Sequence, residues 1–377
     1  MRTTHIIHLV ESNKRHEWLE KLIAHLDRKG FSQTLISLER DGDLRSFLVS
    51  NYPHITMNRV HHKKFNTFTG VNAIRKARKK NTINLVFALG HPAAFIAASA
   101  STVLNVKFIF SHMQQPKFFK LMAPRWRGIF HDFIYDLYIT RADLIHSLSS
   151  EVTEFLVSKG IVQKSIYRVN IGLDFAKVQL QLDSKNLQVH IPEGYPKILM
   201  VGRLAPEKNY RLAFTAFATV REKNPNALLL VAGIGPQKNE LEILAMDLNI
   251  GRSVVFLGFL TNIPQIMTKV DLLLHLATTE SYGQIYMEAM LSQLPVVCSR
   301  SGIAIDLDKD QVSNILVINE LSVQEINSRI DFCLENIKIL RKTNPDPFHT
   351  FRDHNEISVF EKISESFNEV IGNAYGK

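Results

Sequence analysis

Residues 280–290 read ESYGQIYMEAM, and this stretch decides the fold of the 377-residue chain. Two carboxylates, Glu280 and Glu288, stand on either side of Gly283. The apolar run from Val270 to Leu276 precedes them and is typical of a buried parallel strand. A segment of helical composition follows, so the glycine falls where a strand ends and a helix begins. Because ligands bind at the carboxyl ends of strands in α/β sheets, the stretch predicts a binding site.

The predicted helix start suits a phosphate group. Backbone N–H groups at Gly283, Gln284 and Ile285 would point out of the helix, with the positive end of its dipole behind them. Carboxylates repel phosphate but pair well with hydroxyls, so sugar or ribose hydroxyls are the natural partners of Glu280 and Glu288. Taken alone, two glutamates also fit a solvated side chain and an i,i+4 ion pair.

A second candidate site lies upstream, after the apolar run Lys197 to Val201. Gly202 allows the backbone to turn tightly beside a ligand. Arg203 and Lys208 follow and would present two cations at one strand tip, which suits a diphosphate. Either cation alone would also fit a plain salt bridge.

The two segments together resemble family-four retaining glycosyltransferases, which have the GT-B fold. Residues 280–297 resemble the E-x7-E segment of that family and end in its P-V-V run. Residues 202–208 resemble its G-R-x4-K pair. The chain departs from the family at Leu294, where a glycine is usual, in the glycine-free loop 11–15, and around Ser301. The resemblance covers most of residues 197–297 well and the first half by layout only.

The resemblance implies roles for single residues. Glu280 would hold the donor sugar, and His112, after a predicted strand, would lie beside the transferred group, so both are expected to be catalytic. The remaining donor-binding residues are Gly202, Arg203, Lys208, Gly283, Gln284, Ile285 and Glu288. No metal and no cofactor is implied, and a nucleotide-diphosphate sugar is the co-substrate.

The alternation of strands and helices in two halves predicts an α/β protein with two Rossmann-like domains facing a central cleft. We expect an acceptor-side domain at 1–176, a linker at 177–194 and a donor domain at 195–350. The helix at 351–377 would return to the first domain, as the resemblance implies.

Composition and charge limit the setting. The chain has 45% hydrophobic and 21% charged residues, only two cysteines and no long uninterrupted apolar run, so we expect a cytoplasmic globular protein without a signal peptide. Residues 1–190 carry 27 Lys and Arg against 14 Asp and Glu. With the mixed basic and aromatic stretch 117–127, this charge fits either an anionic membrane surface or a solvated face. No recognition module for nucleic acid is visible.

The segment Asp41-Gly42-Asp43 matches the metal signature D-x-D of another glycosyltransferase fold, but a turn after a strand explains it better. The function that the resemblance implies is a retaining hexosyltransferase for cell-surface polysaccharide or glycolipid assembly, peripheral on the inner face of the membrane, and the turn at 41–43 leaves it metal-independent. The alternative is a non-catalytic binding or scaffold protein of GT-B shape at a membrane surface. A phosphorylase-like enzyme fits less well, because no separate lysine site for a pyridoxal cofactor is visible.

Overall fold

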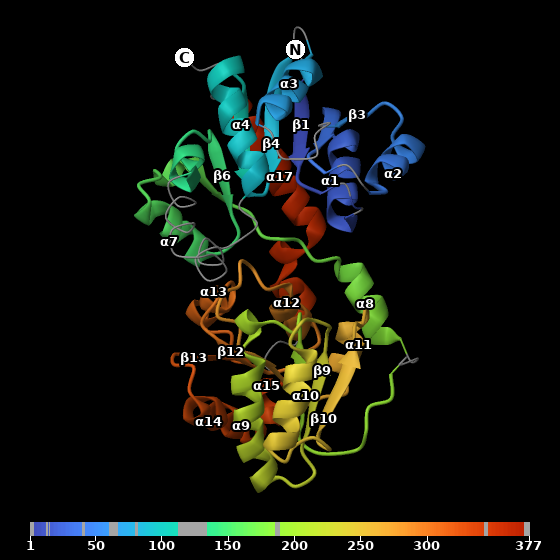
Figure 1. Cartoon of the computed structure of the whole chain (residues 1–377), viewed down its shortest axis with the longest axis vertical. Coiled ribbons are helices and arrows are strands. Elements are labelled where there is room, and N and C mark those ends of the chain that lie inside the picture. Colours follow the sequence, from blue (N-terminus) through green and yellow to red (C-terminus); the bar gives the residue numbers. More distant parts are fainter. Residues whose placement is uncertain are drawn as a thin grey trace. The chain divides into compact units, whose positions relative to one another are not determined.

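The computed structural model describes residues 4–12, 14, 16–39, 42–59, 67–79, 82–111, 134–184, 189–342 and 346–372. The chain divides into two compact units (Figure 1). The first unit comprises residues 1–148, 152–172 and 357–377, and the second comprises residues 149–151 and 173–356. Each unit is a parallel sheet with helices on both faces, which confirms the prediction of two Rossmann-like domains.

Among the described residues, the first unit forms a seven-stranded parallel sheet in the order β3-β2-β1-β4-β5-β6-β7. Its strands are β1 (Thr4–Val10), β2 (Ser32–Ser37), β3 (Thr56–Arg59), β4 (Ile83–Leu89), β5 (Lys107–Ser111), β6 (Leu144–Ser147) and β7 (Ile166–Arg168). Its helices include α1 (Glu17–Arg28), α2 (Leu44–Asn51), α3 (Thr67–Ala77), α4 (His91–Leu104), α7 (Ser150–Ser158) and α17 (Glu356–Gly372).

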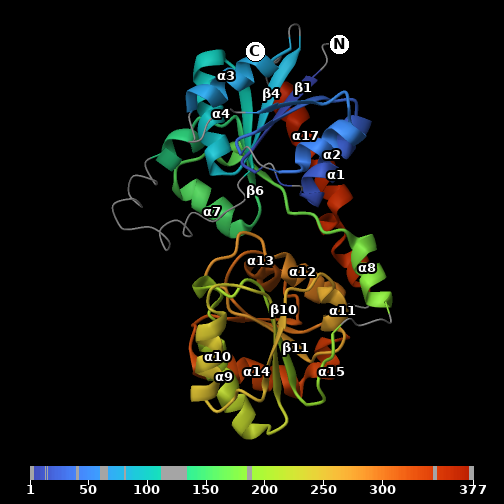
Figure 2. The same cartoon turned by 45° about the vertical axis from the view of Figure 1, so that its right-hand side comes forward.

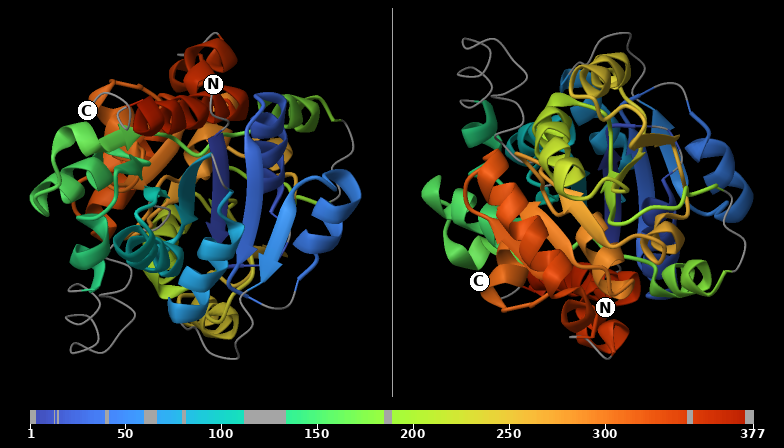
Figure 3. Two further views of the ribbon diagram at one scale, coloured as in Figure 1. Left: turned by 90° about the horizontal axis from the view of Figure 1, so that it is seen from above. Right: turned by 90° about the horizontal axis from the view of Figure 1, so that it is seen from below.

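The two faces of this sheet are covered by different helices (Figure 3, left). Alternate residues of a strand point to opposite faces. Ile7 therefore packs with α3 and α4, whereas Ile6 packs with α1 and α17. In α17 the apolar residues recur at helical spacing, and Phe360 and Phe367 are buried against the sheet. The C-terminal helix thus completes the core of the first unit.

In the part of the second unit that the structure describes, six parallel strands follow the order β10-β9-β8-β11-β12-β13. They are β8 (Lys197–Val201), β9 (Leu228–Ala232), β10 (Val254–Gly258), β11 (Leu272–His275), β12 (Val296–Ser299) and β13 (Ile315–Ile318). The helices include α8 (Phe175–Asp183), α9 (Tyr210–Lys223), α10 (Lys238–Asp247), α11 (Ile263–Met267), α12 (Gln284–Leu291), α13 (Ala304–Lys309), α14 (Val323–Glu335), α15 (Ile337–Leu340) and α16 (Pro347–Thr350).

The strands of the second sheet are nearly continuous apolar runs, because helices bury both of their faces. Helices α9 and α10 lie on one side of the sheet and α11 on the other (Figure 2). Phe214 and Phe217 of α9 are fully buried and pack in one core cluster with Ile198 of β8.

The boundary between the units falls between Gly172 and Leu173. The segment 177–194, which was expected to be an irregular linker, begins inside helix α8. The side chain of Asp174 caps this helix by accepting a hydrogen bond of 2.9 Å from the backbone N–H of Lys177. Its buried residues are only Phe175 and Val178, so the sequence lacks the strong apolar periodicity that would have predicted a helix.

Candidate active site

The two predicted segments meet at one edge of the second sheet. Strands β10, β9 and β8 continue in one direction, and β11, β12 and β13 in the other, so the order reverses between β8 and β11. Loops that follow the two neighbouring strands diverge at such a point, and α/β sheets bind ligands there. The loop after β8 runs through residues 202–209, and the loop after β11 runs through residues 276–283.

Direct hydrogen bonds fix these two loops to each other. The side-chain amide of Asn209 donates to the carbonyl of Leu276 at 2.7 Å and to the hydroxyl of Thr278 at 2.8 Å. The backbone N–H of Thr278 donates to the carbonyl of Glu207 at 2.8 Å. Asn209 has φ of 53°, a left-handed conformation that Asn tolerates better than most residues. Sequence reasoning did not single out Asn209 or Thr278.

Lys208 and Glu280 form an ion pair across the two loops. The Lys208 Nζ lies 2.6 Å from Glu280 Oε2, and each side chain is about one-fifth exposed, at 18% and 21%. The same carboxylate oxygen lies 3.2 Å from Nε2 of His275, the last residue of β11. The predicted strand tips therefore do bring Lys208 and Glu280 together, and they add a histidine that the sequence analysis did not consider.

Glu280 is held in its charged form. Burial by itself would raise the pKa of this carboxyl, but the hydrogen bond from His275 and the charge of Lys208 outweigh it and lower the pKa to about 2. The pKa of His275 is lowered, chiefly by burial. At neutral pH the pair is thus a carboxylate that accepts a hydrogen bond from a neutral imidazole.

Arg203 also has a glutamate partner. Its guanidinium lies 2.5 Å from Glu207, four residues along the chain. Arg203 is 54% exposed, whereas Glu207 is 11% exposed. Both cations predicted to bind a diphosphate are therefore paired with carboxylates. Gly202, next to Arg203, accepts a hydrogen bond of 3.0 Å from the hydroxyl of Tyr210 through its carbonyl.

Gly283 forms the sharp turn into helix α12. Its φ of 88° lies in the left-handed region, and a Cβ placed on it would come within 2.5 Å of the Tyr286 ring. Only glycine satisfies both conditions. Gln284 and Ile285 form the first turn of the helix, where backbone N–H groups point out of the helix end, as predicted for a phosphate site.

Glu288 lies in the second turn of α12 and is partly buried. Within the described residues its carboxylate makes no hydrogen bond. Burial raises its pKa to about 7, so at neutral pH the group exists in both protonation states. A carboxyl group in this condition both donates to and accepts from a hydroxyl, which agrees with the predicted ribose contact.

The loop after β12 closes the site from the other side. The hydroxyls of Ser299 and Ser301 both donate to the carbonyl of Ala277, at 2.6 and 3.1 Å. The backbone N–H of Ile303 donates to the carbonyl of Tyr282 at 2.9 Å. Serines thus fix this loop in the region around Ser301, where the sequence departs from the family.

The first unit has the same reversal of strand order, between β1 and β4. Glu11 follows β1, and its pKa is raised by burial and by the nearby Glu39. Gly90 follows β4 with φ of 90° and precedes His91, which is buried. His112, the predicted catalytic histidine, lies outside the described residues, as do Lys117 to Arg127 and Asp41.

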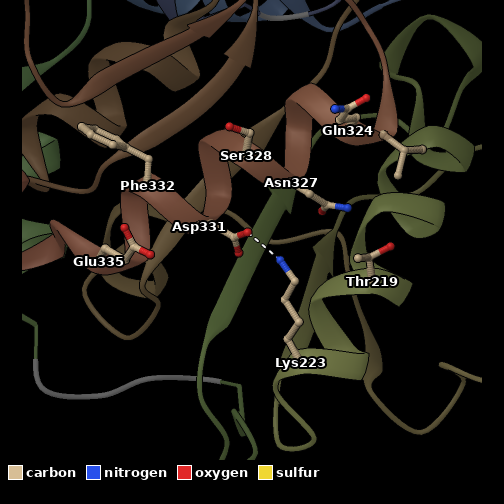
Figure 4. A pocket seen from close by; sticks show the side chains of 9 residues that line it. Thr219, Lys223, Gln324, Asn327, Ser328, Asp331, Phe332 and Glu335 are labelled. Carbon is tan, nitrogen blue, oxygen red and sulfur yellow. Dashed lines mark hydrogen bonds and ion pairs between the residues drawn. The ribbon is translucent and has the colours of Figure 1, made fainter.

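A groove of about 730 Å³ lies away from the strand tips, between α9 and α14 (Figure 4). Lys223 of α9 and Asp331 of α14 form an ion pair of 2.6 Å across it. Half-exposed Phe332 also lines the groove. The ion pair of the groove is exposed and lies in the same unit as Lys208 and Glu280.

The described residues contain no group of three His, Cys, Asp or Glu side chains arranged to hold a metal ion. None of the helices in the described part of the chain combines the length and the apolar composition needed to cross a membrane.

Comparison with known proteins supports the resemblance. Residues 183–344 match the family described as Glycosyl transferases group 1. The match contains both Lys208 and Glu280, so the predicted resemblance is confirmed for this part of the chain.

Individual relatives match over parts of the chain. The chain is 40% identical over 106 residues to 2-deoxystreptamine glucosyltransferase of Streptomyces kanamyceticus, which covers 28% of this chain and 27% of that protein. It is 27% identical over 202 residues to alpha-monoglucosyldiacylglycerol synthase of Streptococcus pneumoniae, which covers 52% of this chain and 44% of that protein. The chain thus spans less than half the length of these curated relatives.

The fold matches over nearly the whole chain. The solved structure of Anabaena HepE in complex with UDP superposes with a TM-score of 0.73 at 20% identity, covering 97% of this chain and 100% of that one. This likeness confirms the GT-B fold.

Proposed function

From the match of residues 183–344 to the family described as Glycosyl transferases group 1, we propose that this chain moves a sugar from a nucleotide-diphosphate sugar to a hydroxyl acceptor. The observation that carries the proposal is the contact between Lys208 and Glu280 where the strand order of the second sheet reverses. A cation, a carboxylate and the start of a helix converge there. The phosphates of a sugar diphosphate would bind the cation and the helix start, and its sugar hydroxyls would bind the carboxylate.

In the proposed complex the diphosphate lies against Gly202 and the start of α12, and it draws Arg203 and Lys208 away from their glutamates. A diphosphate carries more negative charge than a carboxylate, so the exchange is electrostatically favourable. Glu280, released from Lys208, faces the donor sugar, and Glu288 holds ribose hydroxyls.

The proposed transfer retains the configuration of the sugar. Negative charge develops on the departing phosphate, and Lys208, Arg203 and the helix start stabilise it in place of a metal ion. The departing phosphate oxygen takes the proton of the acceptor hydroxyl on the same face of the sugar. No protein nucleophile is required, and His112 is proposed to lie beside the acceptor.

We propose UDP-linked hexoses as the first donors to test, because HepE was solved with UDP and with UDP-glucose. A glycolipid or polysaccharide acceptor is proposed from the relatives, among which is a synthase of alpha-monoglucosyldiacylglycerol. Exposed Arg75, Lys76 and Arg78 near the end of α3 suit docking of the first unit on anionic lipid from the cytoplasmic side.

Thermal shift with UDP, GDP, ADP and CDP, followed by turnover of the matching sugar donors, tests the proposal. We expect one nucleotide to raise the melting temperature and its sugar conjugate to be consumed. A nucleotide that binds without turnover of any conjugate would favour the non-catalytic scaffold instead, since the paired cations would then be structural.

Metal independence is tested separately. Turnover in EDTA should equal turnover in Mg²⁺ or Mn²⁺, because the positive charge is supplied by Arg203, Lys208 and α12. Loss of turnover in EDTA that Mg²⁺ restores would contradict this part of the proposal.

A further inference from the structure

His275 is a histidine inside an otherwise apolar strand. It ends β11 and is 4% exposed. Its backbone is fixed in the sheet, where it pairs in register with Cys298 of β12. Its ring meets the ring of Tyr286 edge to face, with centroids 5.2 Å apart and planes at 83°. The imidazole therefore has a fixed position and direction.

The Nε2 atom of His275 points at the carboxylate of Glu280. It lies 3.2 Å from Glu280 Oε2, the same oxygen that Lys208 contacts at 2.6 Å. Glu280 thus has one partner on a long, flexible side chain and another on a rigid strand. Among the described residues, Glu280 and Lys208 from the loops and Tyr286 from α12 lie around the ring, and Cys298 of β12 is its neighbour in the sheet register.

The two partners differ in what a diphosphate would do to them. Lys208 is a cation and would turn to the phosphates, whereas neutral His275 has no such attraction. A carboxylate that is largely buried needs at least one hydrogen-bond donor, because an unpartnered buried charge is costly. His275 supplies such a donor from a fixed position at the end of the strand, so its contact with Glu280 persists when Lys208 turns to the phosphates.

We propose that His275 is a positioning residue, which holds Glu280 towards the donor sugar after Lys208 has moved to the diphosphate. The inference rests on the proposed function. It adds to that function a distinction between two contacts of Glu280 Oε2: the contact with Lys208 is exchanged when the donor binds, and the contact with His275 is kept. His275 itself touches neither the donor nor the acceptor.

A matched pair of variants in the full chain tests this role. Gln places its amide nitrogen about where Nε2 of histidine lies, whereas Asn is one methylene shorter and falls short of Glu280. Both residues are polar and uncharged, so they share the cost of burial. His275→Gln should therefore keep the contact and His275→Asn should lose it.

The affinity for UDP and the kcat and KM for UDP-glucose are to be measured for both variants. We expect His275→Asn to lower kcat about 10- to 100-fold, as for loss of a hydrogen bond to a charged group. The Kd for UDP should stay within about threefold, and His275→Gln should keep kcat within about threefold of the wild type. A merely structural histidine would change affinity and turnover together and would not be rescued by Gln.

Two outcomes overturn the positioning role. One is an active wild type in which His275→Asn and His275→Gln have equal kcat. The other, decisive even where His275→Asn fails to fold, is a folded His275→Gln that loses more than about tenfold in kcat. If the wild type binds none of UDP, GDP, ADP and CDP, the proposed function itself fails, so the two failures are distinguishable.

Discussion

The two sheets of this chain share one strand order but carry their polar side chains in different places. In the first unit, histidines lie within the strands, with His5 and His8 in β1 and His146 in β6, and all three are fully buried. His8 is hydrogen-bonded to Gln33 at 2.9 Å and His146 to Ser366 at 2.8 Å. Each of these two hydrogen bonds uses Nε2 of the ring, while Nδ1 of His8 and of His146 is buried without a hydrogen-bond partner among the described residues.

In the second unit, charge gathers beyond the strand ends instead. Lys208 and Glu280 lie on loops and remain about one-fifth exposed. The comparison shows that strand order fixes where a ligand can bind. The residues at the strand tips decide whether charged groups are available there to bind it or to act on it. It also predicts that substitutions at the strand tips of the second sheet lower turnover, whereas acid lowers the stability of the first unit.

The largest expected effect is on turnover. Lys208→Ala and Glu280→Gln should each lower kcat/KM of the matching sugar donor by about 100- to 1,000-fold, because each removes a group expected to face developing charge. Lys223→Ala, which breaks an exposed pair of equal length in the same unit, should leave turnover unchanged. The comparison breaks if the Lys223 and Lys208 variants lose activity equally.

Acid should next separate the units by stability. Burial lowers the pKa of His8 from 6.5 to about 4, and burial together with the charge of Lys79 does the same for His5. Between these values the unfolded chain binds protons that the native chain does not. The free energy of unfolding of the first unit should therefore fall by roughly 1–3 kcal/mol per histidine as the pH drops from about 6.5 to 4.

The second unit has an opposing contribution. The pKa of Glu288 is raised to about 7, so its native form binds a proton that the unfolded form lacks between pH 7 and about 4.5. This contribution increases stability as the pH falls and offsets the loss from His275, whose pKa is lowered.

The sequence supplies a separate probe for each unit. Both tryptophans, Trp18 and Trp126, belong to the first unit, and both cysteines, Cys298 and Cys333, are buried in the second. Tryptophan fluorescence should report loss of structure at a higher pH than reaction of the cysteines with dithiodipyridine. Coincident transitions would contradict the difference between the units.

A pair of glycine substitutions sharpens the comparison further. Gly283→Ala places a Cβ within 2.5 Å of the Tyr286 ring and forces φ of 88° on alanine, so we expect a loss of about 2–4 kcal/mol in the free energy of unfolding. Gly90→Ala in the first unit has a similar φ, but among the described residues its new Cβ would come nearest to Glu11, at 3.8 Å. With ψ of 167° it should lose about 1–2 kcal/mol from backbone strain, without a steric clash. Denaturant melts of both variants measure the difference, and equal losses would contradict it.

The smallest effect concerns charge on the first unit. Arg75→Glu with Lys76→Glu should weaken co-sedimentation with anionic liposomes, because each cation near the surface contributes about 1 kcal/mol. Lys223→Glu in the second unit is the matched control and should have no effect. Equal sedimentation of all three proteins, or none with anionic lipid, would leave the basic surface without a membrane role.

The sequence allowed the fold and the two glycine turns of the second unit to be predicted, because apolar runs ending in glycine mark strand tips. The meeting of Lys208 with Glu280 followed from placing both at neighbouring tips. The contact of Arg203 with Glu207 has the spacing of an i,i+4 pair, which the sequence analysis did not use. The contact of His275 with Glu280 could not be predicted, because residues five apart have no regular contact in a helix or a strand. His275 did leave one signal, a titratable residue in the middle of an apolar run. Helix α8 left none, because it buries so few residues.

The position of α17 has a consequence for synthesis on the ribosome. The face of the first sheet that carries Ile6 and Phe87 is covered by α1 and α17. All of residues 173–356 are translated between β7 and the part of α17 that belongs to the first unit. During synthesis, the part of that apolar face that α17 covers therefore stays exposed until the second unit has been translated. The unit that is begun first is the last to be completed.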